Sequence, residues 1–343
     1  MYKRQRRGGH VREGGRTLSE PAIAVEHLGR TFTDRRHEIV ALRDVSFQVG
    51  AGEIVGLLGS NGAGKTTLTK ILATLLLPTT GSARIFGHDV TSDLREVRRM
   101  TGVVLGGDRG LYAKLCGRDN LRFFAMLAGV GRRGLSAKLD AALEQVGLVG
   151  AADRAVETYS KGMRQRLHIA IGMIAEPRVL LLDEPTVGLD PVEAERLRAA
   201  VAALRDTGVS VLLTSHYLLD IERLASRVII LADGTLAADL PVEEFARQAG
   251  YTATVTVRGT GSPPDGGAVS SPDIAVGSVD VAEGAWTLRL HVRDWSVGSF
   301  GLLEQALAHV SVLDVSIEPV RLEDVYSHVA ARLANGIQVG EPR

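Results

Sequence analysis

The chain has 343 residues, an ordinary apolar content of 45% and a formal net charge of zero. It is long enough for two domains, and its charge gives no overall attraction to nucleic acid or anionic lipid. No uncharged apolar run approaches the roughly 18 to 20 residues that a membrane-spanning helix needs, and Cys116 is the only cysteine, which excludes an intrachain disulfide and favours a reducing cytoplasm.

The N-terminal segment is rich in arginine and glycine and lacks the apolar stretch of a secretory signal. We expect residues 1–21 to form a disordered basic arm. A solvated tail, or sequence upstream of the true start codon, is the simpler interpretation, and a contact with phosphate or lipid is the alternative. The folded part is then expected to begin at Ala22.

Strand-like segments precede the most informative motif of the chain. Short strands are predicted at 22–25, 40–42 and 45–49, followed by an apolar strand at 54–58 and a helix that includes 68–72. The turn between that strand and that helix reads Gly59-Ser60-Asn61-Gly62-Ala63-Gly64-Lys65-Thr66-Thr67.

This turn matches the pattern G-x-x-x-x-G-K-[ST] completely and predicts a phosphate-binding loop. Its glycines allow backbone N–H groups to point inward, and the helix N-terminus adds partial positive charge. Lys65 would reach the β- and γ-phosphates, and the Thr66 hydroxyl would ligate Mg²⁺. A glycine-rich turn without a ligand is the alternative, and the flanking strand and helix argue against it.

Further along, the pattern becomes helical from about residue 92 to residue 166. The stretch Tyr159-Ser160-Lys161-Gly162-Met163-Arg164-Gln165-Arg166 ends this region and opens an apolar helix. A serine and a glycine at a helix N-terminus form a second geometry suited to anions.

Two short apolar runs, 179–182 and 209–213, are predicted to be buried parallel strands. The first ends in Asp183-Glu184-Pro185, where Asp183 can hold the Mg²⁺ shell and Glu184 can polarise an attacking water. Acidic residues that are merely solvated are common at strand ends, so this pattern is informative only together with neighbouring motifs. The segment 187–191, which reads VGLDP, follows at once, and Thr214-Ser215-His216 closes the second strand.

The composition changes after Leu240, beyond a hairpin predicted at 228–238. A linking helix near 243–245, strands at 251–257, 286–292 and 312–317, a flexible loop at 259–267 and a helix at 302–310 predict a small α+β appendage over 245–343. The chain shows no internal repeat, which indicates one nucleotide cassette.

In this order and spacing, the motifs resemble those of the ABC ATPases over roughly residues 23–240. GSNGAGKTT looks like the Walker A loop, YSKGMRQR like the signature, LLLDEP like Walker B, VGLD with Asp190 like the D-loop, and His216 like the switch histidine. Phe32 resembles the aromatic residue that stacks on adenine, although a lone phenylalanine is more often core.

The resemblance implies an α/β P-loop NTPase fold: a RecA-like core with an antiparallel β subdomain and a helical subdomain, plus the C-terminal α+β appendage. The ATPase domain would cover 22–244, with the helical subdomain at about 92–166. ATP and Mg²⁺ are the implied cofactors. The implied phosphate and nucleotide ligands are Phe32, residues 59–67, Ser160, Gly162 and Asp190, the metal ligands are Thr66 and Asp183, and the catalytic residues are Glu184, His216 and Lys65.

The resemblance also implies partners. Two ATPase subunits, most simply a homodimer, would clamp two ATP molecules, with Lys65 of one subunit facing Ser160 and Gly162 of the other. A separate multi-span permease would receive the segment 105–125, placing the chain peripherally at the cytoplasmic face of the cell membrane. No nucleic-acid partner is expected.

Departures from the common family pattern refine the comparison. Gly106 stands where a glutamine that contacts the metal is expected. The signature carries Tyr159, Lys161 and Met163, a variant that resembles bacterial exporters of the daunorubicin-resistance type, as do 110–121 and, weakly, the segment 321–326. The appendage fits either a regulatory role or a packing role that stabilises the dimer.

Two other functions remain as alternatives. A soluble ABC ATPase acting on DNA or ribosomes would carry long coiled coils or two cassettes, and the chain has neither pattern. A nucleotide-sensing regulator without turnover would lack Glu184 or His216, and both are present. The favoured function is therefore the ATP-hydrolysing subunit of an exporter.

Overall fold

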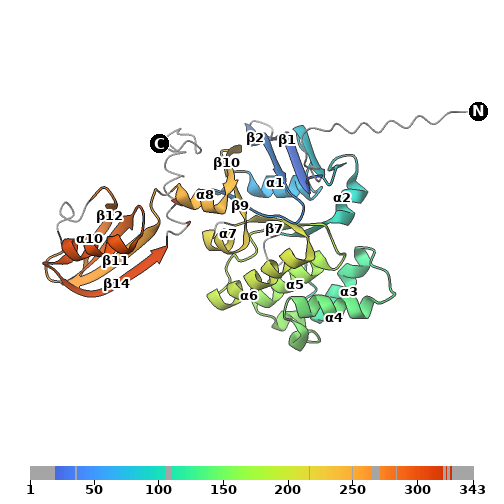
Figure 1. Ribbon diagram of the computed structural model, residues 1–343. Helices are drawn as coiled ribbons and strands as arrows, with labels where there is room; N and C mark the ends of the chain where they lie inside the picture. The colour runs from blue at the N-terminus through green and yellow to red at the C-terminus, as the bar shows by residue number, and fades with distance from the viewer. Residues whose placement is uncertain are drawn as a thin grey trace, which may run out of the picture.

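The computed structural model describes residues 20–34, 37–105, 110–215, 217–248, 250–264, 271–282, 284–319, 322, 325 and 326. Residues 1–19 of the predicted arm, Gly106 and His216 lie outside the described residues. The described chain forms three sheets with helices around them (Figure 1).

A six-stranded sheet lies at the centre of the nucleotide-binding part. Its strands are β3 (Ile54–Gly59), β6 (Thr101–Val104), β7 (Val179–Asp183), β8 (Ser210–Thr214), β9 (Arg227–Ala232) and β10 (Thr235–Pro241), in the order β10-β9-β3-β8-β7-β6. All neighbours pair in parallel except β10, which pairs antiparallel with β9. Every residue of β3, β7 and β8 is buried, as expected for parallel strands covered on both faces.

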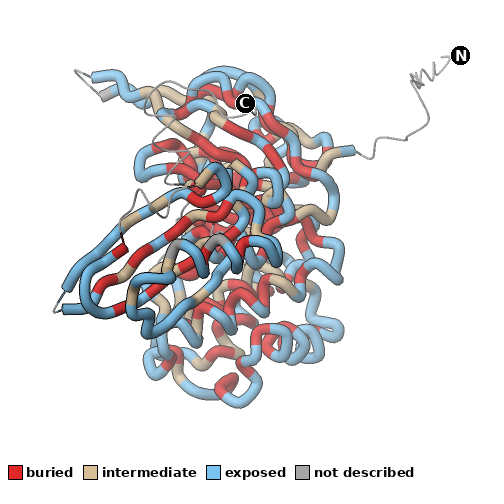
Figure 2. Tube along the Cα trace, turned by 60° about the vertical axis from the view of Figure 1, so that its left-hand side comes forward, coloured by how far each residue is buried: buried red, intermediate tan, exposed pale blue. Residues whose placement is uncertain are grey.

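Helices cover this sheet on two sides. Successive side chains of β3 alternate between two apolar clusters: Ile54 and Leu58 belong to one, and Val55 and Leu57 to the other. In Figure 2 the buried segments, in red, lie mostly in the interior of the molecule, and the exposed segments lie mostly at its periphery. The helices of the sheet layers are α1 (Lys65–Leu72), α2 (Leu94–Met100), α6 (Pro191–Ala202), η3 (Ala203–Thr207), α7 (Leu218–Leu224) and α8 (Val242–Arg247).

A second, antiparallel sheet comes from the N-terminal part of the chain. It consists of β1 (Ile23–Asp34), β2 (His37–Val49), β4 (Thr80–Ile85) and β5 (His88–Asp89), in the order β2-β1-β4-β5. Ile23 pairs with both Val49 and Ile85. The two short strands predicted within 40–49 form one continuous strand, and β4 was not predicted because Gly and Ser weaken its strand pattern.

A helical region lies beside the central sheet. It contains α3 (Gly117–Leu127), α4 (Leu135–Gln145), η1 (Val149–Ala151), η2 (Val156–Thr158) and α5 (Lys161–Met173). The prediction that residue 92 begins this region needs correction, because β6 lies within the predicted range and pairs with β7 in the central sheet. Four residues are too few for the strand to interrupt a helical pattern visibly.

The C-terminal part forms a third sheet with one helix. It contains β11 (Ala253–Thr260), β12 (Ile274–Ala282), β13 (Ala285–Val292), α10 (Val297–Leu307) and β14 (Ser311–Pro319), in the strand order β12-β13-β11-β14. Trp286, Leu288 and Leu290 are buried between this sheet and Leu303 of α10. The predicted strands and helix are present, whereas β12 was not predicted and adds the fourth strand.

Beyond β14 the chain returns to the nucleotide-binding part. Leu322 and Val325 are buried in the same apolar cluster as Leu218 and Phe245, and Tyr326 packs against it. The C-terminal segment therefore contacts the core that carries α7 and α8.

Candidate functional site

The predicted phosphate loop lies between β3 and α1, where the central sheet ends. Gly64 has a φ of 104°, and a Cβ atom there would lie 2.5 Å from the carbonyl oxygen of Ala41 and 2.7 Å from Cδ2 of Leu42. Only glycine satisfies both the left-handed backbone and this close approach. The backbone of α1 begins directly after it, with the Leu68 amide donating to the Gly64 carbonyl at 2.9 Å.

Lys65 is buried, and its side chain folds back along the loop. Its Nζ donates to the carbonyl oxygens of Gly59 at 2.7 Å and Ser60 at 3.1 Å. Burial lowers the pKa of this ammonium, while the negative charges of Glu184 and Asp183 oppose that shift. The cation is therefore held beside the loop and within the electrostatic reach of both carboxylates at the end of β7.

A threonine–aspartate pair joins the loop to the ends of β7 and β8. Oγ1 of Thr66 lies 3.5 Å from Oδ1 of Asp183, and the Thr214 hydroxyl donates to that oxygen at 2.6 Å. Hydroxyl and carboxylate oxygens are the hard donors that Mg²⁺ takes, with phosphate oxygens and water filling its remaining positions. Thr66 and Asp183 therefore fit Mg²⁺. Among the described residues, no group of three or more His, Cys, Asp or Glu side chains could hold a metal ion.

Glu184 adopts a backbone conformation that is unusual for its residue type. Its φ is 50°, which costs a non-glycine residue on the order of 1–2 kcal/mol. Its amide donates to both the hydroxyl and the carbonyl of Thr214, each at 3.0 Å. These bonds hold the turn that takes the chain out of β7 immediately after Asp183.

The signature serine and glycine lie at the start of α5. Ser160 caps this helix by accepting from the Met163 amide at 3.1 Å. A Cβ atom at Gly162 would overlap the side chain of Glu193. The signature therefore packs directly against the first turn of α6.

Asp190 caps that neighbouring helix. Its Oδ1 accepts from the amides of Val192 at 3.0 Å and Glu193 at 2.9 Å, and Pro191 occupies the first helical position. The structure thus brings Asp190 and the signature together through α6, a relation that no sequence motif states.

Phe32 lies on β1, and the residue is 37% exposed. The guanidinium carbon of Arg30 lies 4.5 Å from the ring centroid, a cation–π distance. Phe32 is therefore not a core residue, and one of its ring faces is covered by Arg30.

A cavity of about 330 Å³ adjoins the phosphate loop. It is lined by Leu58, Gly59, Ser60, Asn61, Ser215, Leu218 and Tyr326. Tyr326 was not predicted to lie here, because it is separated by the whole C-terminal sheet from every nucleotide motif. Burial raises the pKa of its phenol.

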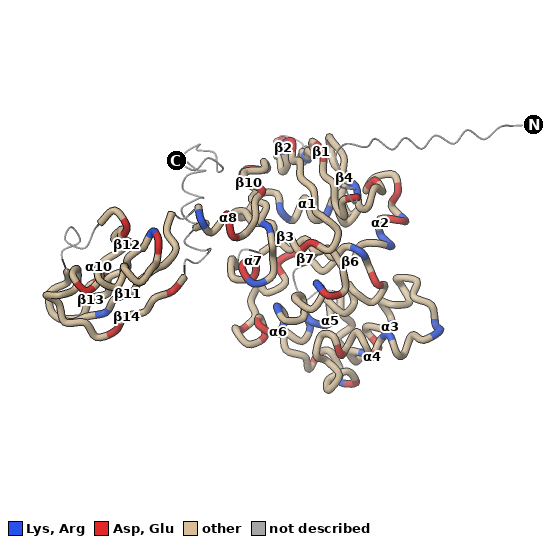
Figure 3. Tube along the Cα trace, viewed as in Figure 1, with Lys and Arg blue, Asp and Glu red and all other residues tan. Residues whose placement is uncertain are grey.

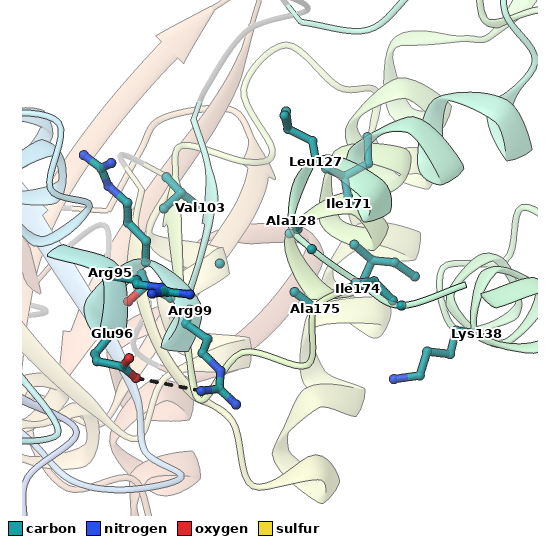
Figure 4. Close-up of a pocket in the computed structure, with 17 residues that line it drawn as sticks. Arg95, Glu96, Arg99, Val103, Leu127, Ala128, Lys138, Ile171, Ile174 and Ala175 are labelled. Carbon is teal, nitrogen blue, oxygen red and sulfur yellow. Dashed lines mark ion pairs between the residues drawn. The ribbon is translucent and has the colours of Figure 1, made fainter. Parts of the chain in front are cut away.

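A larger cavity of about 750 Å³ separates the sheet layer from the helical region (Figure 4). Arg95 and Arg99 of α2 lie on one side, and Leu127, Ile171 and Ile174 lie on the other. A weak ion pair of 3.9 Å joins Glu96 to Arg99. Glu96 lies beside the arginines on the first side, and Lys138 lies on the mainly apolar second side. No sequence motif predicts this cavity.

An aromatic cluster lies next to this region on the surface. The Tyr112 and Phe123 rings are 4.9 Å apart, and Phe124 lies 5.3 Å from Phe123. Tyr112, Phe123 and the neighbouring Met126 are exposed. These residues form the aromatic patch, which falls mostly inside the segment predicted to contact a permease.

Comparison with known proteins agrees with the motifs. Residues 42–187 match the family described as ABC transporter. The doxorubicin resistance ATP-binding protein DrrA of Mycobacterium tuberculosis (strain CDC 1551 / Oshkosh) is 42% identical over 67% of this chain and 69% of its own length. The daunorubicin/doxorubicin resistance ATP-binding protein DrrA of Streptomyces peucetius is 33% identical over 90% of this chain and 92% of its own.

A solved structure described as the ATP-binding subunit of an ABC transporter is 30% identical to this chain. It has a TM-score of 0.59 and covers 67% of this chain and 93% of its own. Within the part of the chain that the structure describes, we find no helix with the length and apolar character to cross a bilayer.

Proposed function

This chain belongs to the ATP-binding proteins of ABC transporters, and on that premise we propose that it drives export of a substrate through a separate membrane permease. The fold is the predicted α/β P-loop NTPase, with a RecA-like core, an antiparallel sheet and a helical region, followed by the small α+β sheet. As a member of this family the chain binds ATP and hydrolyses it to ADP and phosphate.

The observation that carries the assignment of the ATP site is the convergence of Lys65, Thr66 and Asp183. Because β3, β8 and β7 are neighbours in a parallel sheet, their C-terminal ends meet at one edge. We assign the backbone of residues 59–67 and Lys65 to the ATP phosphates. Thr66 and Asp183 would hold Mg²⁺, which when bound supplies charge neutralisation at the β- and γ-phosphate oxygens.

Glu184 is the residue we assign to the attacking water. It follows Asp183 directly at the end of β7, and its negative charge opposes the lowering of the Lys65 pKa by burial. Its carboxylate would orient or deprotonate the water. His216 would stabilise the γ-phosphate side, and Phe32 would stack on adenine.

The second half of the nucleotide site would come from another copy of the chain. Ser160, Gly162 and Asp190 lie together through α5 and α6, and we propose that they face the ATP bound to Lys65 of a partner ATPase subunit. Closure of the homodimer would then exclude water and perform the mechanical work, and hydrolysis would reset it.

The permease would dock beside the helical region, at the cytoplasmic face of the membrane. The aromatic patch offers exposed apolar surface there, and rigid exposed aromatic residues are typical anchors of protein interfaces. The relatives named for doxorubicin and daunorubicin resistance support a drug as the exported substrate.

We further propose that residues 22–244 form the ATPase domain, residues 245–343 an accessory domain and residues 1–21 a basic arm. The separate apolar cluster of the C-terminal sheet supports this division, although Leu322 and Val325 pack back into the ATPase core.

An ATPase that acts on nucleic acid or ribosomes is the disfavoured alternative. Nucleic-acid-binding proteins gather Lys and Arg on one face. In this chain acidic and basic residues are interspersed along the described trace (Figure 3), and the formal net charge is zero.

Co-purification from membranes tests the export function. The tagged full chain, expressed in its own host, should be recovered with a multi-span membrane protein in mild detergent. Phe123→Asp should reduce that recovery strongly, and the matched surface change Val149→Asp, on an exposed residue outside the aromatic patch, should not. Recovery with ribosomes or nucleic acid alone would contradict the proposal.

A further inference from the structure

Asp220 on α7 is a buried carboxylate to which none of the roles above assigns a function. Asp220 is 0% exposed, and its carboxylate contacts three other side chains. Burying an ionised carboxylate is costly unless it is paired and hydrogen-bonded. The identity of its partners therefore indicates what this residue does.

The first partner is a cation on the neighbouring helix. Nη1 of Arg198 on α6 lies 2.9 Å from Oδ1 of Asp220, and the Arg198 side chain is 9% exposed. Arg198 also binds Glu195 at 3.0 Å, at the surface. The Arg198 pair joins α7 to the helix whose N-terminus is capped by Asp190.

The second oxygen of Asp220 contacts the segment that follows Glu184. The Thr186 hydroxyl donates to Oδ2 of Asp220, and Thr186 is itself buried. The backbone on both sides of Thr186 is also fixed, since the Val187 amide donates to the Glu184 carbonyl at 3.4 Å and the Leu189 amide to the Thr186 carbonyl at 3.1 Å. Asp220 thereby holds the turn that leads from Glu184 to the D-loop.

The same oxygen contacts the end of β8. The Ser215 hydroxyl donates to Oδ2 of Asp220 at 2.8 Å and accepts from the Tyr217 amide at 2.9 Å. Ser215 and Tyr217 are the sequence neighbours of position 216. Oδ2 of Asp220 therefore links two segments of the chain. One contains Thr186 and follows Glu184, the residue assigned to the water, and the other contains Ser215 and precedes the assigned switch histidine.

We infer that Asp220 is a positioning residue for ATP hydrolysis. It fixes the turn after Glu184 and the end of β8 at Ser215 against each other, and so keeps the two segments that lead to the assigned hydrolytic residues in a constant relation. This inference rests on the proposed roles of Glu184 and His216. A misplacement of about 1 Å in such a site lowers turnover roughly 100-fold, whereas ATP binding depends on the phosphate loop, which Asp220 does not touch.

The test is the separation of kcat from ATP affinity in the full chain. Asp220→Asn keeps the size of the side chain and removes its charge; we expect kcat to fall roughly 10- to 100-fold while the Kd for a fluorescent ATP analogue changes less than about twofold. Thr186→Val and Ser215→Ala each remove one hydroxyl and leave the Asp220–Arg198 pair intact, so they measure the same effect if Asp220→Asn does not fold. Glu195→Gln changes an exposed partner of Arg198 that makes no contact with Asp220 among the described residues; it is the matched control and should keep wild-type kcat.

A second comparison separates positioning from stability. In the Asp220→Asn background, Ser215→Ala should cause little further loss of kcat, because both changes break one network. Wild-type kcat in a folded Asp220→Asn variant, or in both Thr186→Val and Ser215→Ala, overturns the inference. Glu184→Gln is assayed in parallel. If this variant hydrolyses ATP at the wild-type rate, the proposed role of Glu184 is wrong. If Glu184→Gln is inactive while the Asp220, Thr186 and Ser215 variants keep wild-type kcat, only the role of Asp220 is wrong.

Discussion

Arg166 of the signature helix and Glu193 of the D-loop helix form an ion pair of 3.1 Å, with side chains only 8% and 13% exposed. Arg166 also donates to the carbonyl oxygens of Val146 at 2.9 Å and Gly147 at 3.1 Å. The two motifs proposed to face a partner's nucleotide are thus joined within one subunit by a nearly buried pair.

This pair predicts a large stability cost for Glu193→Gln. The change leaves the nearly buried Arg166 guanidinium with backbone carbonyls but without the negative charge that compensates it, and breaking a buried pair in this way costs about 3–5 kcal/mol in the free energy of unfolding. Urea unfolding of the full chain measures it. Arg196→Ala removes the exposed partner of Glu193 and should cost less than about 1 kcal/mol; equal effects of the two changes would refute the argument.

The phosphate loop offers a matched pair of glycines for a second prediction. Gly62 and Gly64 both have positive φ, but a Cβ at Gly62 meets open space whereas one at Gly64 meets the Ala41 carbonyl. Gly62→Ala should lose about 1–2 kcal/mol of stability from backbone strain. Gly64→Ala should lose more, and should also lose affinity for a fluorescent ATP analogue; an equal loss in both variants would show that the close approach does not matter.

The accessory sheet can be tested through its tryptophans. Trp286 and Trp295 are the two tryptophans of the chain, so intrinsic tryptophan fluorescence reports on that sheet alone. A Cβ at Gly259 would overlap the Trp286 ring, and Gly259→Ala should lower the fluorescence unfolding midpoint by an amount corresponding to roughly 1–3 kcal/mol.

The Gly259→Ala variant should still bind the ATP analogue, because the steric overlap between the new Cβ and Trp286 lies outside the central sheet. Gly301→Ala, where a Cβ meets open space in α10, should leave the midpoint unchanged or raise it slightly. Loss of ATP binding together with the fluorescence transition would mean that residues 22–244 do not fold independently of the accessory sheet.

Local motifs predicted the parts of the site that local chemistry determines. The phosphate loop, the strand before Asp183 and the capping Ser160 each depend on a few consecutive residues, and the structure contains all three. The strands β4 and β6 were not predicted, because β6 has only four residues and β4 contains Gly and Ser, so neither shows a clear strand pattern. The positions of Tyr326, Glu193 and Asp220 could not be predicted, since each depends on packing between elements that are distant in the sequence.

Glu184→Gln tests the central claim most directly. The variant is mixed with ATP and Mg²⁺, and both hydrolysis and dimer mass are measured in solution. We predict that hydrolysis falls about 10²- to 10⁴-fold, as expected for loss of a general base, while an ATP-bound dimer accumulates. Hydrolysis at the wild-type rate, or a variant that binds ATP as a monomer at every concentration, would contradict the account.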